Sequence, residues 1–388
     1  MQHFYFDHNA TTPVAPEVLR DLTKTLAEVS GNASSIHHFG QAAKQRLESA
    51  RRDLAARLGA EAREIVFTSG GTESDNLAVF GIARRALAVR SALGRAHVIT
   101  CAIEHPAVLN ACAQLEREGA EVTYLRPRAN GIVPADDVKR ALRPSTAMIS
   151  IMHANNETGV LQPVREIGTL ARSAGVIFHS DGVQVGGRFP VNVREIGVDL
   201  YSISGHKFGA PKGVGALYVR KGVVLDALLF GGHHERDRRA GTENVPGASA
   251  LARACELAAG WADIAPLRDR LEQGILERVR GAKVNGSIEQ RMPNTSNIRF
   301  DGIEGEAMVI ALDLRGYAVS SGSACSSGAV EPSHVLLAMG LRPEEARSSV
   351  RFSLGPENTE SEVDGLIAAV EASVAHLRRI SPAVAIHV

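Results

Sequence analysis

The chain has 388 residues, and its 43 Lys and Arg residues balance its 43 Asp and Glu residues, so the formal net charge is zero. That length exceeds the roughly 250–300 residues at which a single hydrophobic core usually divides, so two domains are expected. The balanced charge gives no general reason to expect nucleic acid or an anionic membrane as a partner. The sequence contains neither an uninterrupted run of 18 apolar residues nor a signal-peptide layout, so we expect a soluble, cytoplasmic protein.

Helical and extended patterns alternate over the first two thirds of the chain. Apolar residues recur every three or four positions between residues 43 and 58, as on one face of an amphipathic helix. Short extended runs, several of them separated by helix-compatible stretches, follow at 64–68, 97–100, 121–125, 147–152, 175–179 and 199–203. This alternation predicts an α/β fold whose mostly parallel sheet is covered by helices on both faces. In such sheets ligands bind beyond the carboxyl ends of the strands.

The order of the elements changes after about residue 250. A long helix-compatible stretch at 261–280 precedes the extended runs 297–300, 317–320 and 350–353, and a final helix is expected at about 360–377. These elements predict a smaller α+β domain. We place the large domain at residues 15–256, and the small domain at residues 1–14 and 257–388.

A lysine and an aspartate stand at the ends of neighbouring extended runs. Lys207 closes a Ser-Gly-His-Lys segment after the run 199–203, and Asp181 closes a His-Ser-Asp segment after the run 175–179. Pyridoxal phosphate chemistry needs a lysine amine that holds the cofactor aldehyde as a Schiff base, and a carboxylate that keeps the pyridine nitrogen protonated. The pair therefore predicts a pyridoxal 5′-phosphate site. A surface turn is the alternative for the Ser-Gly-His-Lys segment considered alone.

A Gly-Gly-Thr segment is suited to the phosphate of that cofactor. It ends in Gly71 and Thr72, follows an extended run and opens a helix, where backbone N–H groups and a hydroxyl can meet an anion. Ser204 and His206 could add further donors. The alternative is a tight turn with a helix N-cap.

Polar residues also follow other extended runs. His105 could stack on the pyridine ring and exchange protons, or it could cap the next helix. An amide of the segment 155–159, which contains Asn155 and Asn156, could hold the phenolic oxygen of the cofactor or the substrate, and Gln184 could do the same. Arg351 is a single charge inside an apolar run, which suits either the carboxylate of an amino acid or an internal ion pair.

Cys325 lies in the segment 320–328, which contains only small residues. Such a segment contributes little to a core and is expected to be mobile, so we expect it to present Cys325 as a nucleophile. The other three cysteines, Cys101, Cys112 and Cys255, lie in strand-like or helix-like runs and are expected in the core. The segment 231–235 contains histidines and a glutamate, but their spacing matches no zinc signature, so no metal site is predicted.

Together these motifs resemble the cysteine desulfurases of the NifS/IscS type, which are fold-type I pyridoxal phosphate enzymes of the class V aminotransferase-like group. The resemblance covers nearly the whole chain. Its motifs lie at residues 7–13, 65–76, 104–105, 153–159, 179–184, 204–213, 239–242, 320–325 and 351–355.

The resemblance implies an enzyme that removes sulfur from L-cysteine, yields L-alanine and leaves a persulfide on Cys325. The sulfur would pass to an acceptor, such as a scaffold for iron–sulfur cluster assembly. Lys207, His105 and Cys325 would be catalytic, and Arg351 with Asn156 would bind the substrate. The implied cofactor contacts come from Gly71, Thr72, His105, Asn156, Asp181, Gln184, Ser204, His206 and Lys207, with Thr242 reaching the phosphate from the second subunit of a homodimer.

Two alternatives remain open from the sequence. A selenocysteine lyase, or another pyridoxal phosphate lyase or aminotransferase of this fold, would not need the Cys325 thiol. A non-catalytic partner protein would keep the fold for binding alone, although the presence of Lys207, Asp181, His105 and Cys325 argues against it.

Overall fold

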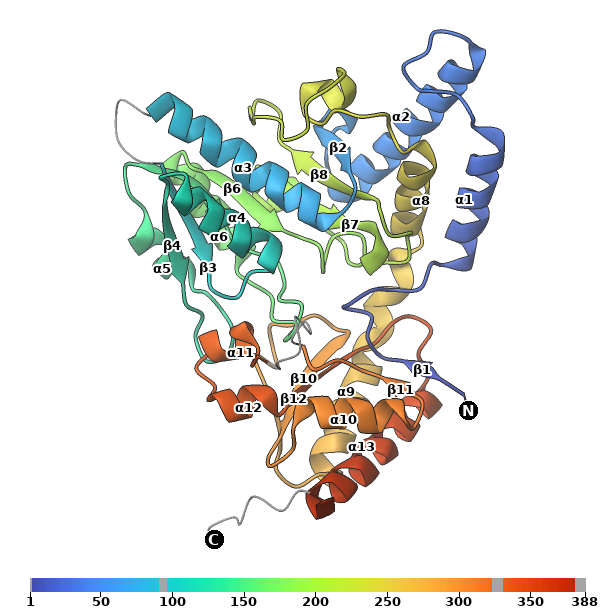
Figure 1. Ribbon diagram of the computed structural model, residues 1–388, viewed down its shortest axis with the longest axis vertical. Helices are drawn as coiled ribbons and strands as arrows, with labels where there is room; N and C mark the ends of the chain where they lie inside the picture. The colour runs from blue at the N-terminus through green and yellow to red at the C-terminus, as the bar shows by residue number, and fades with distance from the viewer. Residues whose placement is uncertain (1, 91–95, 323–330, 381–388) are drawn as a thin grey trace.

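The computed structural model describes residues 2–90, 96–322 and 331–380 (Figure 1). Its largest sheet has seven strands. In spatial order these are β2 (Ile65–Thr68), β8 (Gly215–Val219), β7 (Leu200–Ser204), β6 (Ile177–Asp181), β5 (Thr146–Ser150), β3 (His97–Cys101) and β4 (Glu121–Leu125). Strand β8 runs antiparallel to both of its neighbours, and the other paired strands are parallel. The predicted mostly parallel sheet is confirmed, whereas β8 was not predicted.

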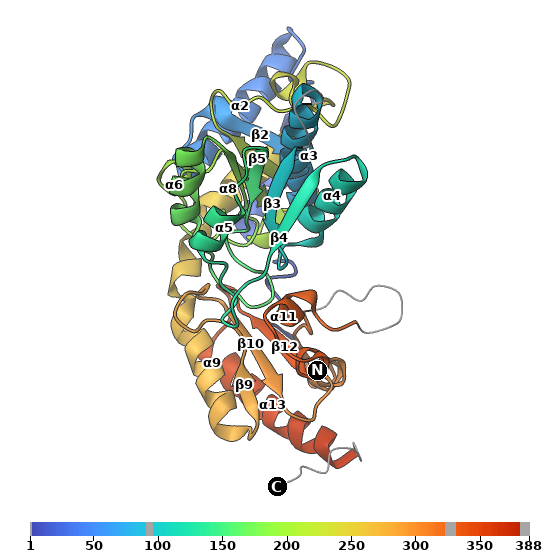
Figure 2. The same cartoon turned by 90° about the vertical axis from the view of Figure 1, so that its left-hand side faces the viewer.

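Helices cover both faces of this sheet (Figure 2). One face carries α3 (Gly71–Arg90) and α4 (Pro106–Arg117). The other face carries α2 (His38–Leu58), α5 (Ala135–Ala141), α6 (Val164–Ala174) and α8 (Val245–Glu256), with α1 (Pro16–Glu28) packed against α8. Consecutive strand residues serve opposite faces: Met148 packs in the core under α3 and α4, and Ile149 packs in the core under α2 and α6. Such strands are buried on both sides, which explains their nearly continuous apolar sequences.

The smaller part of the chain lies below the large sheet in Figure 1. Its three-stranded antiparallel sheet has the order β12 (Ser349–Ser353), β10 (Thr295–Phe300), β9 (Ala282–Val284). A short parallel pair joins β1 (Phe4–Tyr5) to β11 (Tyr317–Ala318), which brings the N-terminal strand beside this part of the chain. The helices are α9 (Ala265–Arg278), α10 (Gly305–Asp313), α11 (His334–Ala338), α12 (Pro343–Arg347) and α13 (Glu360–Ile380).

Two details of the smaller part differ from the prediction. The helix expected from residue 261 begins at Ala265, because the preceding residues form the 3-10 helix η4 (Ala258–Ile264). Helix α11 contributes Val335 and Leu336 to the core of the large sheet rather than to the core of the small one. The domain division at residue 256 stays a prediction.

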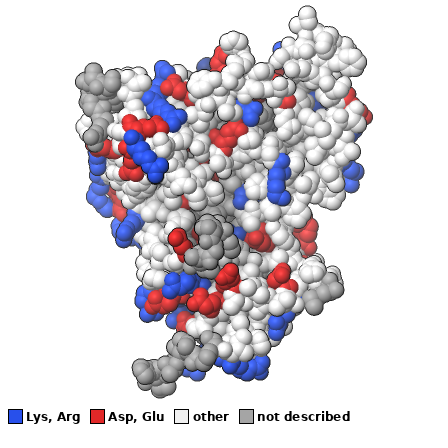
Figure 3. All heavy atoms as spheres, in the orientation of Figure 1, with Lys and Arg blue, Asp and Glu red and all other residues white. Residues whose placement is uncertain are grey.

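The surface charge and the positions of three cysteines can be compared with the expectations from sequence. Positive and negative side chains are interspersed over the face shown in Figure 3. Cys101, Cys112 and Cys255 are buried and free, which confirms the prediction that they are core residues. No helix among the described residues is both long and apolar enough to cross a bilayer.

A buried ion pair holds the segment 231–235, whose histidines and glutamate are residue types that can bind metals. Arg51 on α2 is 2% exposed, and both of its terminal nitrogens contact the Glu235 carboxylate at 2.7 Å. Glu235 also accepts a hydrogen bond from the Phe67 amide at 3.0 Å. Glu235, Arg236 and Asp237 have φ angles of 46°, 58° and 63°, a left-handed backbone that costs roughly 1–2 kcal/mol for each residue with a side chain. The carboxylate therefore anchors strained backbone.

Candidate active site

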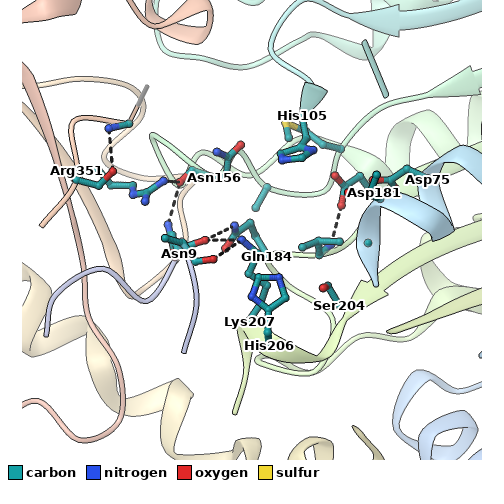
Figure 4. Close-up of a pocket in the computed structure, with 18 residues that line it drawn as sticks. Asn9, Asp75, His105, Asn156, Asp181, Gln184, Ser204, His206, Lys207 and Arg351 are labelled. Atoms are coloured by element: carbon teal, nitrogen blue, oxygen red, sulfur yellow. Dashed lines mark hydrogen bonds between the residues drawn. The ribbon is translucent and has the colours of Figure 1, made fainter. Parts of the chain in front are cut away.

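A cavity of about 360 Å³ lies where the large sheet meets the smaller part of the chain (Figure 4). Strands β2, β3, β5, β6 and β7 point their carboxyl ends towards it, because all five run in one direction. Among the residues that line it are Gly71, Thr72, His105, Asn156, Asp181, Gln184, Ser204, His206, Lys207 and Arg351. Every one of these was predicted as a site residue from sequence.

Two predicted site residues are not placed in this cavity. Thr242 is exposed and does not line the cavity of its own chain. Cys325 lies outside the described residues. Ser320 and Gly322, which precede it in the sequence, do line the cavity.

Lys207 ends the short 3-10 helix η2 (Gly205–Lys207), directly after β7. Its Nζ atom donates to the main-chain oxygens of Asn9 at 2.8 Å and Ala10 at 2.9 Å. Burial, reinforced by the nearby charges of Arg188 and Arg351, lowers the pKa of Lys207 to about 7. A substantial fraction of the amine is therefore neutral near pH 7, and the neutral amine is the form that can condense with an aldehyde.

Asp181 ends β6 on another wall of the cavity (Figure 4). Its Oδ1 accepts a hydrogen bond from the Val183 amide at 2.8 Å. Burial raises the pKa of Asp181, while His105, the Val183 hydrogen bond and Lys207 act in the opposite direction. The ionised form of Asp181 would be stabilised by a cationic partner, such as a protonated ring nitrogen.

The start of α3 supplies donors for an anion. The first amides of a helix have no acceptor within the helix, and they lie at the positive end of its dipole. Gly71 allows close approach, since a Cβ added there would lie 2.7 Å from a methyl carbon of Val183. The hydroxyl-bearing residues Thr72 and Ser204 line the same cavity. This donor set fits a phosphate group.

His105 caps a helix and also lines the cavity. It is the N-cap of α4, where its Nδ1 accepts a hydrogen bond from the Ala107 amide at 3.1 Å, and its ring also lines the cavity. Since Nδ1 is the acceptor, the neutral ring carries its proton on Nε2. Burial lowers the pKa of His105, which favours this neutral form.

Arg351 on β12 already has an anionic partner. Its Nη2 lies 2.6 Å from Asp7 Oδ1, and its Nη1 donates to the Asn156 main-chain oxygen at 3.0 Å. Arg351 thus forms the internal ion pair that was considered as the alternative to substrate binding. The same side chain also lines the cavity. The buried Nε atom has no hydrogen-bond partner among the described residues, so its N–H group is available to a ligand.

Sequence reasoning did not single out Asn9 and Arg188, which organise the floor of the cavity. The main-chain oxygen of Asn9 accepts from Lys207, and its Oδ1 accepts from Arg188 Nη1 at 2.9 Å. Its amide donates to Ser353 Oγ at 3.0 Å, and its Nδ2 donates to Thr295 Oγ1 at 2.9 Å. Asn9 lies in the recognised motif at residues 7–13, and that motif was the available signal.

Glu157 is a buried carboxyl group at the junction of the two parts of the chain. It follows β5, accepts a hydrogen bond from Ser333 at the start of α11, and lies close to Gly322. Burial raises the pKa of Glu157 from 4.5 to about 7, against the effects of Ser333 and Arg351. The folded protein therefore holds this proton more tightly than the unfolded chain does.

A Glu157→Gln variant is expected to weaken the pH dependence of stability. Because the folded pKa is the higher one, the wild-type protein should lose up to about 3 kcal/mol from this group as the pH rises from 4.5 through 7. The amide cannot ionise, so the stability of the variant relative to the wild type should increase as the pH rises from 5 to 8. Urea midpoints across that range would measure the difference, with the exposed Glu166→Gln as the control. Equal slopes for wild type and Glu157→Gln would contradict the prediction.

Comparison with known proteins identifies close relatives. The family described as aminotransferase class-V matches residues 4–366. A cysteine desulfurase of Gluconacetobacter diazotrophicus is 49% identical, over 98% of this chain and 96% of the relative. A solved NifS-like protein has a TM-score of 0.89 and 35% identity, covering 97% of this chain and 100% of that chain. The protein SspA, solved in complex with cysteine, has a TM-score of 0.81 and 37% identity, covering 92% and 99% of the two chains.

Proposed function

The chain belongs to the class-V aminotransferase family, and we propose that it is a cysteine desulfurase that uses pyridoxal 5′-phosphate to convert L-cysteine into L-alanine. One observation carries the proposal. Lys207, Asp181 and Arg351 line a single cavity. Ser320 and Gly322 line it too, and they precede Cys325 in the sequence. The relatives named cysteine desulfurase align over nearly the whole chain, which supports the same reaction here.

The residues of the cavity fit the cofactor. Lys207 offers a partly neutral amine, Asp181 offers an anion, and the start of α3 with Thr72 and Ser204 offers donors for the phosphate. When bound, pyridoxal phosphate supplies a protonated ring that withdraws electrons from the substrate Cα. Asp181 would keep that ring nitrogen protonated, and Gln184 and Asn156 would hold the phenolic oxygen.

The chain's own groups would then carry out the transfer. Arg351 would hold the substrate carboxylate, and Lys207 would move the proton from Cα. His105 would stack on the ring and offer its Nε2 proton. The Cys325 thiolate would attack the substrate sulfur, so that the carbon–sulfur bond breaks as the sulfur–sulfur bond forms. The products are alanine and a persulfide on Cys325, which together account for the atoms of the substrate and of the thiol.

Partners and location form part of the same proposal. Thr242 would reach the phosphate of the neighbouring subunit in a homodimer, and its exposure in a single chain supports this role. The persulfide would pass to an acceptor protein in the cytoplasm, such as a scaffold for iron–sulfur clusters. This acceptor follows from the resemblance to the NifS/IscS type.

Replacing Cys325 with alanine tests the reaction directly. The variant is expected to bind pyridoxal phosphate normally, yet to form alanine from cysteine at least about 100-fold more slowly, because the nucleophile is lost. Alanine formation and the absorbance of the bound cofactor would be measured together. The buried Cys255→Ala is the matched control, and it should keep its activity.

The outcome separates the alternatives. Full alanine production by Cys325→Ala would rule out the persulfide route and favour a lyase that does not need the thiol. A purified wild-type protein that binds no pyridoxal phosphate would instead favour the non-catalytic alternative.

A further inference from the structure

A second carboxyl group lies beside Asp181 in the wall of the cavity (Figure 4). Asp75, in the first turns of α3, is 1% exposed and lines the cavity, and no role was predicted for it from sequence. Its Oδ1 has no hydrogen-bond partner among the described residues. The nearby Nε2 atom of His179 lies 3.6 Å from that oxygen.

His179 does not supply a positive charge to Asp75. Its Nδ1 shares a hydrogen bond with Ser150 Oγ at 2.9 Å, and its Nε2 shares one with Ser202 Oγ at 3.0 Å. The ring is fully buried, and burial lowers the pKa of His179 to about 3. At neutral pH the imidazole is therefore uncharged and bonded to hydroxyl groups.

The ionisable groups that act most strongly on Asp75 are carboxyls. Burial raises the pKa of Asp75 well above its usual range, and the charges of Asp181 and Glu104 raise it further, while a hydrogen bond from Ser202 acts in the opposite direction. Glu104 is itself fully buried, and burial raises its pKa to about 8. An ionised Asp75 would thus be a buried anion without a cationic partner among the described residues, which is strongly unfavourable.

Asp181 is the better anion of the two. The Val183 amide donates to it, and His105 and Lys207 favour its charged form whenever they carry a proton. Two carboxyl groups that share a buried site rarely ionise together, so the pair holds one proton. The contacts place that proton on Asp75.

We propose that Asp75 is a positioning residue that stays protonated in the folded enzyme and offers a hydrogen bond to Asp181, which it thereby holds as the anion that meets the cofactor ring. A hydrogen bond to the charged form of a carboxylate stabilises that form. The inference deepens the proposed function and rests on its cofactor, but it does not depend on which substrate reacts.

The Asp75→Asn and Asp75→Ala variants distinguish a neutral donor from a charge. Asparagine keeps a polar N–H group and carries no charge. The affinity of the Asp75→Asn protein for pyridoxal phosphate should therefore stay within about threefold of wild type, and the pH transition of the cofactor absorbance should stay within about 0.3 pH unit. Alanine removes the donor, so binding should weaken about tenfold and the transition should move by about one pH unit. Ser74→Ala, which removes a buried hydroxyl from the same turn and does not line the cavity, is the matched control.

A measurement without the cofactor tests the proton itself. A protonated Asp75 means that folding takes up a proton, so the cofactor-free protein should lose stability as the pH rises above the ordinary range of aspartate. The Asp75→Asn protein should take up about one proton fewer on folding near pH 6, as judged from the slope of stability against pH.

Each outcome decides the inference. It is supported if asparagine behaves like wild type in the cofactor measurements, alanine does not, and the proton uptake falls. It is overturned if asparagine shifts the absorbance transition as alanine does, if neither variant changes cofactor binding, or if the slope is unchanged. Wild-type protein that binds the cofactor but makes no alanine from cysteine would overturn the proposed function and leave this test intact.

Discussion

A Lys207→Ala variant is expected to form alanine from cysteine at least about 1000-fold more slowly than the wild-type protein, because one change removes the cofactor's covalent anchor and the group that moves the Cα proton. The fold should persist, since among the described residues the amine donates only to the main-chain oxygens of Asn9 and Ala10. Alanine formation, together with the cofactor retained after dialysis, would measure the two losses separately.

The matched control for this prediction is Lys221→Ala, which removes an exposed lysine away from the cavity. It should keep both activity and cofactor. A Lys207→Ala protein with more than a tenth of the wild-type rate would contradict the assignment of Lys207. In that case another amine of the chain would have to carry out the chemistry.

A Glu235→Ala variant is expected to lose about 3 kcal/mol of unfolding free energy, at the lower end of the usual cost of breaking a buried ion pair, because Glu48 still contacts Arg51 Nε at 3.0 Å. Arg51 is 2% exposed and would lose its only bidentate partner among the described residues, and the Phe67 amide would lose an acceptor. Urea unfolding at pH 7 with a fixed cofactor concentration would measure the change.

Two comparisons sharpen this second prediction. Glu195→Ala breaks the exposed pair with Arg165, 2.8 Å apart, and should cost no more than about 1 kcal/mol. Combining Glu235→Leu with Arg51→Met removes both buried charges and should recover much of the loss. A loss below about 1 kcal/mol in Glu235→Ala would show that the buried pair does not hold this segment.

The sequence predicted the site better than it predicted some elements around it. Most of the predicted residues meet because they lie at or just after the ends of strands of the large sheet, and parallel strands bring their carboxyl ends to one edge. Arg351 is the exception, since it lies inside β12 of the small sheet. Strand β8 was missed because it has glycines at its start and carries no chemical motif, and because its antiparallel direction depends on its neighbours. Propensity cannot reveal pairing of that kind.

The residues that sequence reasoning overlooked act through tertiary contacts. Arg188 is 1% exposed and donates to Asn9 and Gln184, but its sequence neighbours Gly187 and Phe189 give no sign of these partners. Arg351 shows a further limit, because its pairing with Asp7 joins residues 344 positions apart. Spacing along a chain indicates the chemistry that a residue could perform, but it does not indicate which distant residue the side chain contacts in the folded protein.

The position of Asn9 has a consequence for how the protein is made. Its amide meets Ser353, 344 positions later in the chain, and its main-chain oxygen receives the Lys207 amine. During synthesis, Asn9 must therefore wait for a partner that leaves the ribosome 344 positions later. Contacts of such long range form slowly, since a long loop must close first. The cavity is completed only after Ser353 has been made, so the cofactor is expected to bind after that residue has left the ribosome.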